Sequence, residues 1–261
     1  MINMKFDNLF DLTGKVAIVT GGGNGIGKAC CLMLSKAGAA IAVSDLKYDD
    51  ANKVVDEIRN NGGKAIAIEC NVTKDQDLVA VAETTVKELG GIHILVNNAG
   101  GGGGGRENPF KITVDEFAWR FQLNVFSAWR LSQLCAPYMK EGKYGSIINI
   151  TSMSSVNKSP NMSAYSASKA AMNHMTANLA MDYGLDNIRV NAVGPGATKT
   201  AALASVLTPE IEAKMLANTP IKRLGEVEDI AGAVYYFAAP VSEWVSGQVI
   251  FVNGGGVQTL D

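Results

Sequence analysis

The chain lacks a strong charge of either sign, and it lacks any long uninterrupted apolar stretch. Its 261 residues include 23 Lys or Arg and 25 Asp or Glu, a net charge of −2, so no long-range attraction to nucleic acid or to an anionic membrane is expected. No run reaches the roughly 18 apolar residues of a membrane-spanning helix, and residues 1–10 lack the apolar centre of a secretory signal. We therefore expect no membrane span, no export and no nucleic-acid partner.

Cysteine and histidine are also scarce. The four cysteines form no Cys-x-x-Cys pattern, and Cys30 and Cys31 are adjacent, which disfavours an ordinary disulfide. His93 and His174 are isolated from each other and from any cluster of Asp or Cys, so no metal site is expected. Reduced, buried thiols are typical of a cytoplasmic protein, and we expect that location.

No Pro- or Ser-rich linker and no internal repeat divides the chain, so we expect a single domain over residues 1–261. Short runs rich in Ile and Val, without polar alternation, are typical of strands buried on both faces, and helix-like stretches lie between them. The alternation predicts an α/β fold with a parallel sheet and helices on both of its faces. The expected strands are residues 16–19, 39–43, 65–68, 92–96, 147–150, 188–193 and 249–252. The expected helices are residues 25–36, 50–60, 75–89, 114–139, 163–183 and about 227–237.

Two stretches interrupt this alternation. Residues 100–105 are six consecutive glycines directly after an expected strand. They suit a backbone that passes close to a ligand, although a linker is the alternative. Residues 195–225 contain no expected strand and only helical pieces near residues 208–217, so we interpret them as a substrate lid or binding loop.

A glycine-rich turn joins the first expected strand to the first expected helix. It has the spacing Gly-x-x-x-Gly-x-Gly, a variant of the usual dinucleotide fingerprint. Glycines let a pyrophosphate approach the backbone, and the following helix N-terminus offers unpaired N–H groups. We therefore predict cofactor binding by Gly21, Asn24, Gly25, Ile26 and Gly27.

Asp45 ends the second expected strand, and Leu46 follows it. A carboxylate there can accept hydrogen bonds from the adenosine ribose hydroxyls and would repel the additional phosphate of NADP. At an effective dielectric of ~20, two unit charges ~4 Å apart interact by ~4 kcal/mol at most. No Arg flanks Asp45, although Lys47 is close. We expect NAD as cofactor. The alternative is that Asp45 is only a turn residue at the end of a strand.

Further polar residues follow other expected strands. Asn71 and Val72 follow the third, Asn98 the fourth and Ser152 the fifth. Ligands of open parallel sheets bind beyond the carboxyl ends of the strands, near the point where the strand order reverses. We expect these residues to gather at one cofactor site.

Tyr165 and Lys169 lie four residues apart on an expected helix, with Ser152 upstream. Residues at this spacing share a helix face, so the ammonium would lie beside the phenol. Its positive charge, with a second one on a bound cofactor, would bring the phenol pKa from about 10 toward neutrality. The product would be a proton acceptor suited to work near neutral pH. Alone, the Tyr-x-x-x-Lys pattern is unspecific.

Taken together and in order, these motifs resemble the short-chain dehydrogenase/reductase family over about residues 14–256. The resemblance rests on Thr20-Gly21-x-x-x-Gly25-Ile26-Gly27, on Asn97-Asn98-Ala99-Gly100, on Asn124, Ser152, Tyr165 and Lys169, and on Pro195-Gly196. It implies a Rossmann-type, doubly wound, seven-stranded sheet and a homotetramer or homodimer. One departure is Asn71, where the family commonly has an Asp that contacts adenine. An amide oxygen can still accept a hydrogen bond there.

The resemblance also implies roles at the catalytic positions. Tyr165 exchanges the proton of the substrate hydroxyl, Ser152 donates to the substrate oxygen, and Lys169 lowers the Tyr165 pKa and binds the nicotinamide ribose. Asn124 would anchor a water that links Lys169 to solvent, or it could be a polar residue at a helix kink. Thr198 and Thr200 could bind the nicotinamide carboxamide, or cap the next helix.

Segments that go beyond the shared catalytic set resemble family members that oxidise the 7α-hydroxyl of bile acids to the 7-keto product. These segments are residues 97–103, 150–153, 157–158, 161–162, 208–212 and 254–258. By this resemblance Gly102 and Asn157 would contact a steroid substrate, together with Ser152 and Tyr165. Two alternatives remain open: a reductase of another carbonyl, such as a sugar or a 3-oxoacyl thioester, and a non-catalytic nucleotide sensor.

Overall fold

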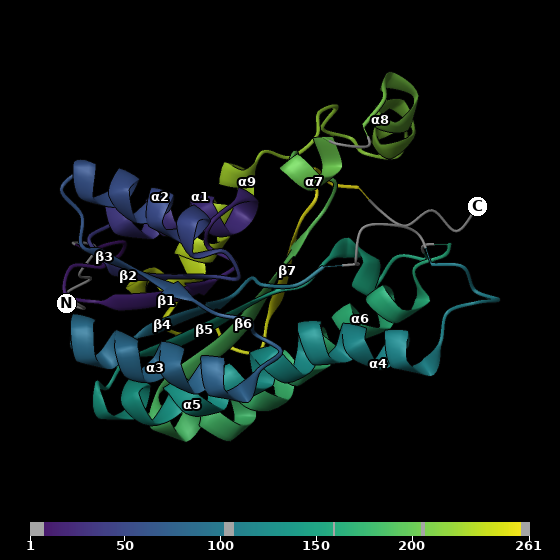
Figure 1. Ribbon diagram of the computed structural model, residues 1–261. Coiled ribbons are helices and arrows are strands. Elements are labelled where there is room, and N and C mark those ends of the chain that lie inside the picture. Colours follow the sequence, from purple (N-terminus) through teal and green to yellow (C-terminus); the bar gives the residue numbers. More distant parts are fainter. Residues whose placement is uncertain (1–7, 102–106, 159, 205–206, 257–261) are drawn as a thin grey trace, which may run out of the picture.

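Seven short apolar segments form one parallel sheet in the computed structural model, which describes residues 8–101, 107–158, 160–204 and 207–256 (Figure 1). The strands are β1 Val16–Thr20, β2 Ala40–Asp45, β3 Ala65–Glu69, β4 Ile94–Asn97, β5 Gly145–Ile150, β6 Ile188–Pro195 and β7 Val249–Val252. Their order is β3-β2-β1-β4-β5-β6-β7, and every pairing is parallel. The predicted doubly wound sheet is confirmed.

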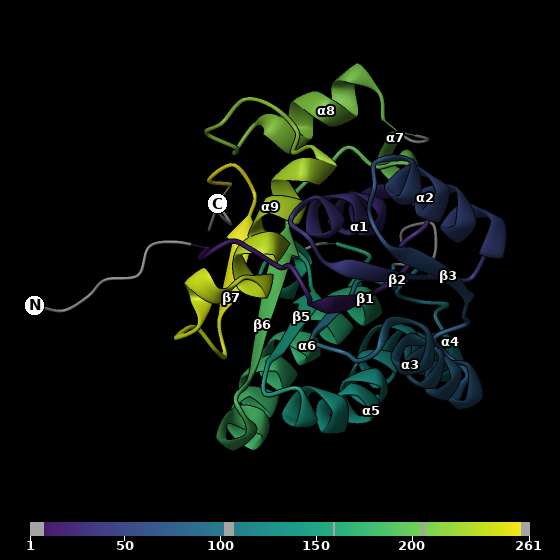
Figure 2. The same ribbon diagram turned by 90° about the vertical axis from the view of Figure 1, so that its left-hand side faces the viewer.

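Helices cover both faces of this sheet (Figure 2). They are α1 Gly25–Lys36, α2 Tyr48–Asn60, α3 Asp75–Leu89, α4 Val114–Phe121, α5 Ser127–Glu141, α6 Ser163–Tyr183, α7 Ala201–Ala204, α8 Pro209–Leu216 and α9 Val227–Ala238. The helices α1, α2 and α9 lie on one face, and α3, α5 and α6 on the other. The expected bounds of α1, α3 and α6 agree with the structure.

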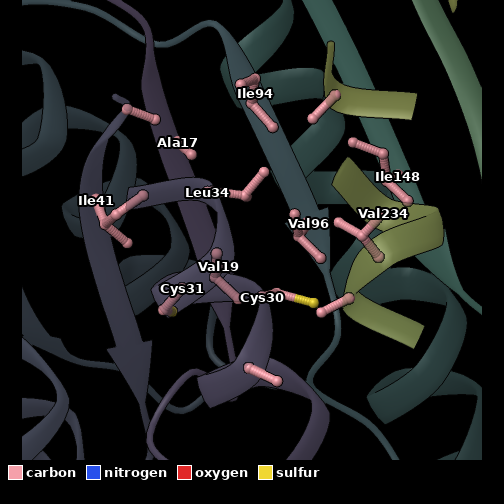
Figure 3. Close-up of a cluster of buried hydrophobic side chains, with 14 of the residues drawn as sticks. Ala17, Val19, Cys30, Cys31, Leu34, Ile41, Ile94, Val96, Ile148 and Val234 are labelled. Carbon is pink, nitrogen blue, oxygen red and sulfur yellow. The ribbon is translucent and has the colours of Figure 1, made fainter. Parts of the chain in front are cut away.

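Alternate residues of the central strands pack into two separate cores, one on each face of the sheet, which explains why the strands are apolar throughout. In β1, Ala17 and Val19 belong to the core under α1 and α9, which also contains Leu34 and Val234 (Figure 3). Val16 and Ile18 point to the opposite core. Cys30 and Cys31 lie in the first core, and all four thiols are buried and unpaired, as expected from their spacing.

The expected helix over residues 114–139 is interrupted. The helix α4 passes through a π-helical turn, Gln122–Phe126, into α5. The apolar pattern of the sequence continues through the turn, so periodicity alone did not reveal it. Such turns often occur at functional sites, and this one carries Asn124.

Two further segments bear on the expected organisation. After β6 the chain forms α7 and α8, which stand outside the two helix layers (Figure 1). His93 precedes β4, and its Nδ1 accepts a hydrogen bond from the Val16 N–H at 3.1 Å, a structural role. Among the described residues, no helix has the length and apolarity to span a membrane, and no three potential metal ligands cluster.

Candidate active site

The strand order reverses between β1 and β4, which opens the crevice where parallel sheets bind ligands. Tyr165 and Lys169 reach this region from the first two turns of α6. The Lys169 Nζ lies 5.9 Å from the Tyr165 ring centroid and donates to the Ile150 carbonyl at 2.8 Å. Its side chain is almost fully buried, and this burial lowers the pKa of Lys169 to about 8.

The phenol does not have the lowered pKa expected from the spacing with Lys169. Burial raises the pKa of Tyr165, and a side-chain hydrogen bond with Ser152 offsets only part of that rise. The ammonium is directed at the Ile150 carbonyl, so it contributes little at the phenol oxygen. Acidification of the phenol therefore depends on the additional positive charge that a bound cofactor would supply.

Ser152 directly follows β5 and the buried Thr151. Its Oγ accepts from the Ser154 N–H at 3.1 Å, and its backbone carbonyl accepts from the Ser155 hydroxyl at 2.6 Å. These bonds make Ser152 the N-cap of the short 3-10 helix Met153–Ser155. The Ser152 side chain also hydrogen bonds with that of Tyr165.

Asn124 lies in the π-helical turn, fully buried. Its Oδ1 accepts from the Gly101 N–H at 2.9 Å, and its Nδ2 donates to the Ser168 hydroxyl at 2.9 Å. The Ser168 hydroxyl in turn donates to the Tyr165 carbonyl at 2.7 Å. A Cβ at Gly100 would lie 2.6 Å from the Asn124 Oδ1, so a larger residue there would displace the Asn124 amide. Asn124 thus lies at a helix irregularity and also connects to the helix of Tyr165.

The glycine-rich turn packs against the end of β4. The Asn98 Nδ2 donates to the carbonyls of Thr20 at 2.9 Å and Gly21 at 3.0 Å. A Cβ at Gly27 would lie only 2.0 Å from the Gly21 carbonyl oxygen. Gly21 and Gly25 have positive φ values of 61° and 52°, which favour glycine. The side-chain amide of Asn98 therefore shapes this turn.

Asp45 lies at the edge of the same turn. Its Oδ2 accepts from the Gly23 N–H at 2.9 Å, and its Oδ1 from the Lys47 N–H at 3.1 Å. Each carboxylate oxygen has a further lone pair, so ribose hydroxyls can still be bound. Asn24, before α1, donates to Asp50 at 3.3 Å. The five glycines among residues 21–27 and the acid at the edge of the turn fit a dinucleotide.

The side-chain oxygen of Asn71 is less available for binding adenine than the position of the residue suggests. Its Oδ1 accepts from both the N–H and the hydroxyl of Thr73, at 3.0 and 2.7 Å. The oxygen expected to bind adenine is therefore already used within the turn after β3. Val72 beside it is buried, Ile26 is half-buried, and Leu46 is exposed.

The two threonines after β6 have different partners. The Thr198 hydroxyl donates to the Gly196 carbonyl at 3.1 Å, and its backbone pairs with Gly225. The Thr200 Oγ1 accepts from the Leu203 N–H at 3.3 Å, the capping arrangement considered above. The Thr200 methyl lies 3.7 Å from where a Cβ of Gly25 would be, so Thr200 also flanks the glycine-rich turn.

Of the two expected substrate contacts, Gly102 lies outside the described residues. Asn157 follows Ser152 closely, and its N–H donates to the Met153 carbonyl at 2.9 Å. Its Oδ1 is buried without a protein partner in the part of the chain that the structure describes.

Two residues with contacts at the site were missed by the sequence reasoning. The Thr20 hydroxyl accepts from the N–H groups of Asn98 and Ala99 at 3.1 and 3.0 Å, which fixes β4 against β1. Glu107 hydrogen bonds to the start of α6. Thr20 could have been found, because it is the first residue of the motif Thr20-Gly21-x-x-x-Gly25-Ile26-Gly27. Nothing in the sequence near Glu107 indicates a partner more than fifty residues away.

Comparisons with known proteins agree with this geometry. The family described as enoyl-(acyl carrier protein) reductase matches residues 21–256. A 7α-hydroxysteroid dehydrogenase of Escherichia coli K12 is 51% identical over 255 residues, 98% of either chain. A 7α-hydroxysteroid dehydrogenase of Clostridium sardiniense is 36% identical over 94% of either chain.

Among solved structures, a 7α-hydroxysteroid dehydrogenase complexed with NADH and 7-oxoglycochenodeoxycholic acid is 50% identical. It superposes with a TM-score of 0.94 over 99% of this chain and 100% of that one. The chain belongs to the short-chain dehydrogenase/reductase family of oxidoreductases.

Proposed function

We propose that this chain is an NAD-dependent dehydrogenase that oxidises the 7α-hydroxyl of bile acids to the 7-keto product, reversibly. The observation that carries this proposal is the 51% identity to the Escherichia coli enzyme over nearly the whole of both chains. The cluster of the partly buried Ser152 and Tyr165 with the buried Lys169 supports the same reaction type, because alcohol oxidation needs a proton acceptor beside the carbinol.

In the proposed reaction Tyr165 takes the proton of the substrate hydroxyl. Ser152 donates to the substrate oxygen and keeps it near the phenol. Lys169 holds its charge near Tyr165 and would bind the nicotinamide ribose, while Asn124 would anchor a water beside Lys169. NAD, when bound, accepts the hydride. A positioned proton transfer contributes about 10²- to 10⁴-fold in rate.

The cofactor would lie along the carboxyl ends of β1, β2 and β4. Gly21, Gly25 and Gly27 leave room for the pyrophosphate, and Asp45 would bind the adenosine ribose and disfavour the additional phosphate of NADP. We assign supporting contacts to the remaining expected residues: Asn24, Ile26, Leu46, Asn71, Val72, Asn98, Thr198 and Thr200.

The chain would act as one domain over residues 1–261, with residues 195–225 as the substrate lid. Gly102 and Asn157 would contact the steroid beside Ser152 and Tyr165. The unpartnered Oδ1 of Asn157 supports this role, because a buried acceptor is costly unless a ligand or water binds it.

We further propose a cytoplasmic homotetramer, or a dimer. Trp119, Phe126 and Trp129 on the α4–α5 segment are between 44% and 51% exposed. Phe126 and Trp129 line a groove of about 780 Å³, a surface suited to a second copy of the chain. The four buried, unpaired thiols support the location.

The proposal is tested by NAD reduction with three bile acids. Cholate and chenodeoxycholate carry a 7α-hydroxyl, whereas deoxycholate does not. We expect turnover of the first two and none of the third. Turnover of deoxycholate at a similar rate would contradict the assigned position. If none of the three bile acids supports NAD reduction, the proposal is overturned in favour of a reductase acting on a sugar or a 3-oxoacyl thioester.

A further inference from the structure

The helix that carries Tyr165 has no N-cap of its own. Met162 occupies the N-cap position of α6 and makes no side-chain capping bond. The first backbone N–H groups of a helix have no partner within it, so those of Ala164 and Tyr165 need an acceptor from elsewhere. Tyr165 is the third residue of α6, which places the proton acceptor in the turn that is least fixed by the helix itself.

Glu107 supplies that acceptor from the segment between β4 and α4. Its Oε2 accepts from the Ser163 hydroxyl and the Ala164 N–H, both at 2.9 Å. Its Oε1 accepts from the Tyr165 N–H at 3.0 Å. The Glu107 N–H also donates to the Asn161 carbonyl at 2.7 Å. Both the backbone and the side chain of Glu107 therefore hold the start of α6.

The environment of Glu107 keeps its carboxyl charged. Burial acts to raise the pKa, because Glu107 is only 8% exposed. The hydrogen bonds from Ala164, Tyr165 and Ser163, followed by the positive charge of Arg120 on α4, outweigh burial and lower the pKa. A charged carboxylate at a helix N-terminus is also favoured by the helix dipole.

We propose that Glu107 is a positioning residue, whose carboxylate fixes the first turn of α6 and so sets the phenol of Tyr165 against Ser152 for proton transfer. The inference rests on the proposed function, because it assigns Tyr165 the proton. Small displacements of a reacting group are costly: about 1 Å can reduce a rate about a hundredfold. Glu107 itself touches no reacting atom, and it acts through the backbone of Ala164 and Tyr165.

The test compares Glu107→Ala and Glu107→Gln with the control Glu116→Ala. Glu116 has the same chemistry at a different helix, since its carboxylate caps α4, and its side-chain hydrogen bonds in the described part of the chain are all with Thr113. With bile acid and NAD we expect Glu107→Ala to lower kcat by about ten- to a hundredfold and to leave the KM for NAD within about threefold. Glu107→Gln retains one acceptor oxygen, so its kcat should be intermediate. Glu116→Ala should retain a normal kcat.

Two further measurements separate positioning from loss of stability. The acid limb of the kcat pH profile should move to higher pH in Glu107→Ala, because a displaced phenol loses the Ser152 bond that lowers its pKa. Hydrogen exchange of the Ala164 and Tyr165 amides should be at least about tenfold faster in that variant. If Glu107→Ala does not fold, the pH profile and the hydrogen exchange are measured on Glu107→Gln instead.

Unchanged exchange, or a folded variant with a kcat within about twofold of wild type, would overturn the role of Glu107. The hydrogen-exchange measurement requires no substrate. If the wild-type protein shows no activity on bile acids, the proposed function fails, but hydrogen exchange of the Ala164 and Tyr165 amides still decides whether Glu107 holds the first turn of α6.

Discussion

At the scale of single residues, the proposed chemistry depends on a buried ammonium and a partly buried phenol four residues apart. Burial moves both groups away from the charged form, with the pKa of Lys169 near 8 and that of Tyr165 above its ordinary value. The spacing predicted that the two side chains would be neighbours. It did not predict that the ammonium would turn to the Ile150 carbonyl, because that partner lies on β5, 19 residues before Lys169, and not on its own helix.

Tyr165→Phe should reduce kcat for bile acid oxidation by about 10²- to 10⁴-fold, because it removes the proton acceptor and little else. Affinity for NADH, measured by fluorescence titration, should stay within about twofold. Tyr183→Phe, at the other end of the same helix, serves as the control and should retain activity. Near-normal turnover of Tyr165→Phe would remove Tyr165 from this role.

Lys169 should make the stability of the cofactor-free protein depend on pH. Its pKa is about 8 when folded and 10.5 as the reference for an unfolded chain. The unfolded state therefore binds more protons between these values, and the free energy of unfolding increases as pH rises from 8 to 10.5. The increase from this group should be roughly 3 kcal/mol. Below pH 8 the destabilisation is fully present and no longer changes.

Urea unfolding of wild type and Lys169→Met across this range isolates the effect, because other titrating groups are shared. The difference between the two proteins should change by most of that amount. A constant difference between them would show that Lys169 is not desolvated as the structure indicates.

Asp45→Ala should lower kcat/KM for NAD by about tenfold and raise the relative use of NADP. The variant loses the ribose acceptor and the negative charge that disfavours an additional phosphate. Asp49→Ala changes an exposed acid in the first turn of α2 and is the matched control. An unchanged ratio of NADP to NAD use would show that Asp45 does not select the cofactor.

At the scale of helices and strands, the sequence predicted what is local. Apolar periodicity placed α1, α3 and α6 correctly, and runs of Ile and Val placed all seven strands to within a few residues. The π-helical turn at Asn124 was not predictable, because one extra residue in a helix barely changes the apolar pattern. Glu107 was missed because its partners are brought near only by the fold.

Gly27→Ala should strongly weaken cofactor binding. Its Cβ would lie 2.0 Å from the Gly21 carbonyl oxygen, so the glycine-rich turn must shift. We expect NADH affinity, measured by fluorescence titration, to fall by at least about a hundredfold, or 2.7 kcal/mol by the usual conversion. Gly232→Ala in α9 is the control, because a Cβ there meets nothing within 4 Å. Normal affinity in Gly27→Ala would place the pyrophosphate elsewhere.

At the scale of the whole molecule, the proposed assembly would bury the exposed aromatic side chains of the α4–α5 segment. Phe126→Asp would introduce a charge into the groove formed with Trp129 and Val72, and it should reduce the oligomer to smaller species in sedimentation velocity. Leu185→Asp changes another apolar residue, 97% exposed, in the short 3-10 helix that follows α6, and it should leave the assembly unchanged. Retention of the wild-type species by Phe126→Asp would exclude this surface from the interface.

The Lys169 ammonium and the Asn98 side-chain amide donate to main-chain oxygens of Ile150, Thr20 and Gly21. Ile150 and Thr20 end β5 and β1, and Gly21 follows β1 directly, so the backbone of the sheet fixes where these oxygens lie, whichever side chains fill its interior. Exchanges among Val, Ile and Leu of matching volume in β1 and β5 could therefore accumulate over evolutionary time without disturbing the reacting groups. The same tolerance makes these strands a suitable place for stabilising redesign.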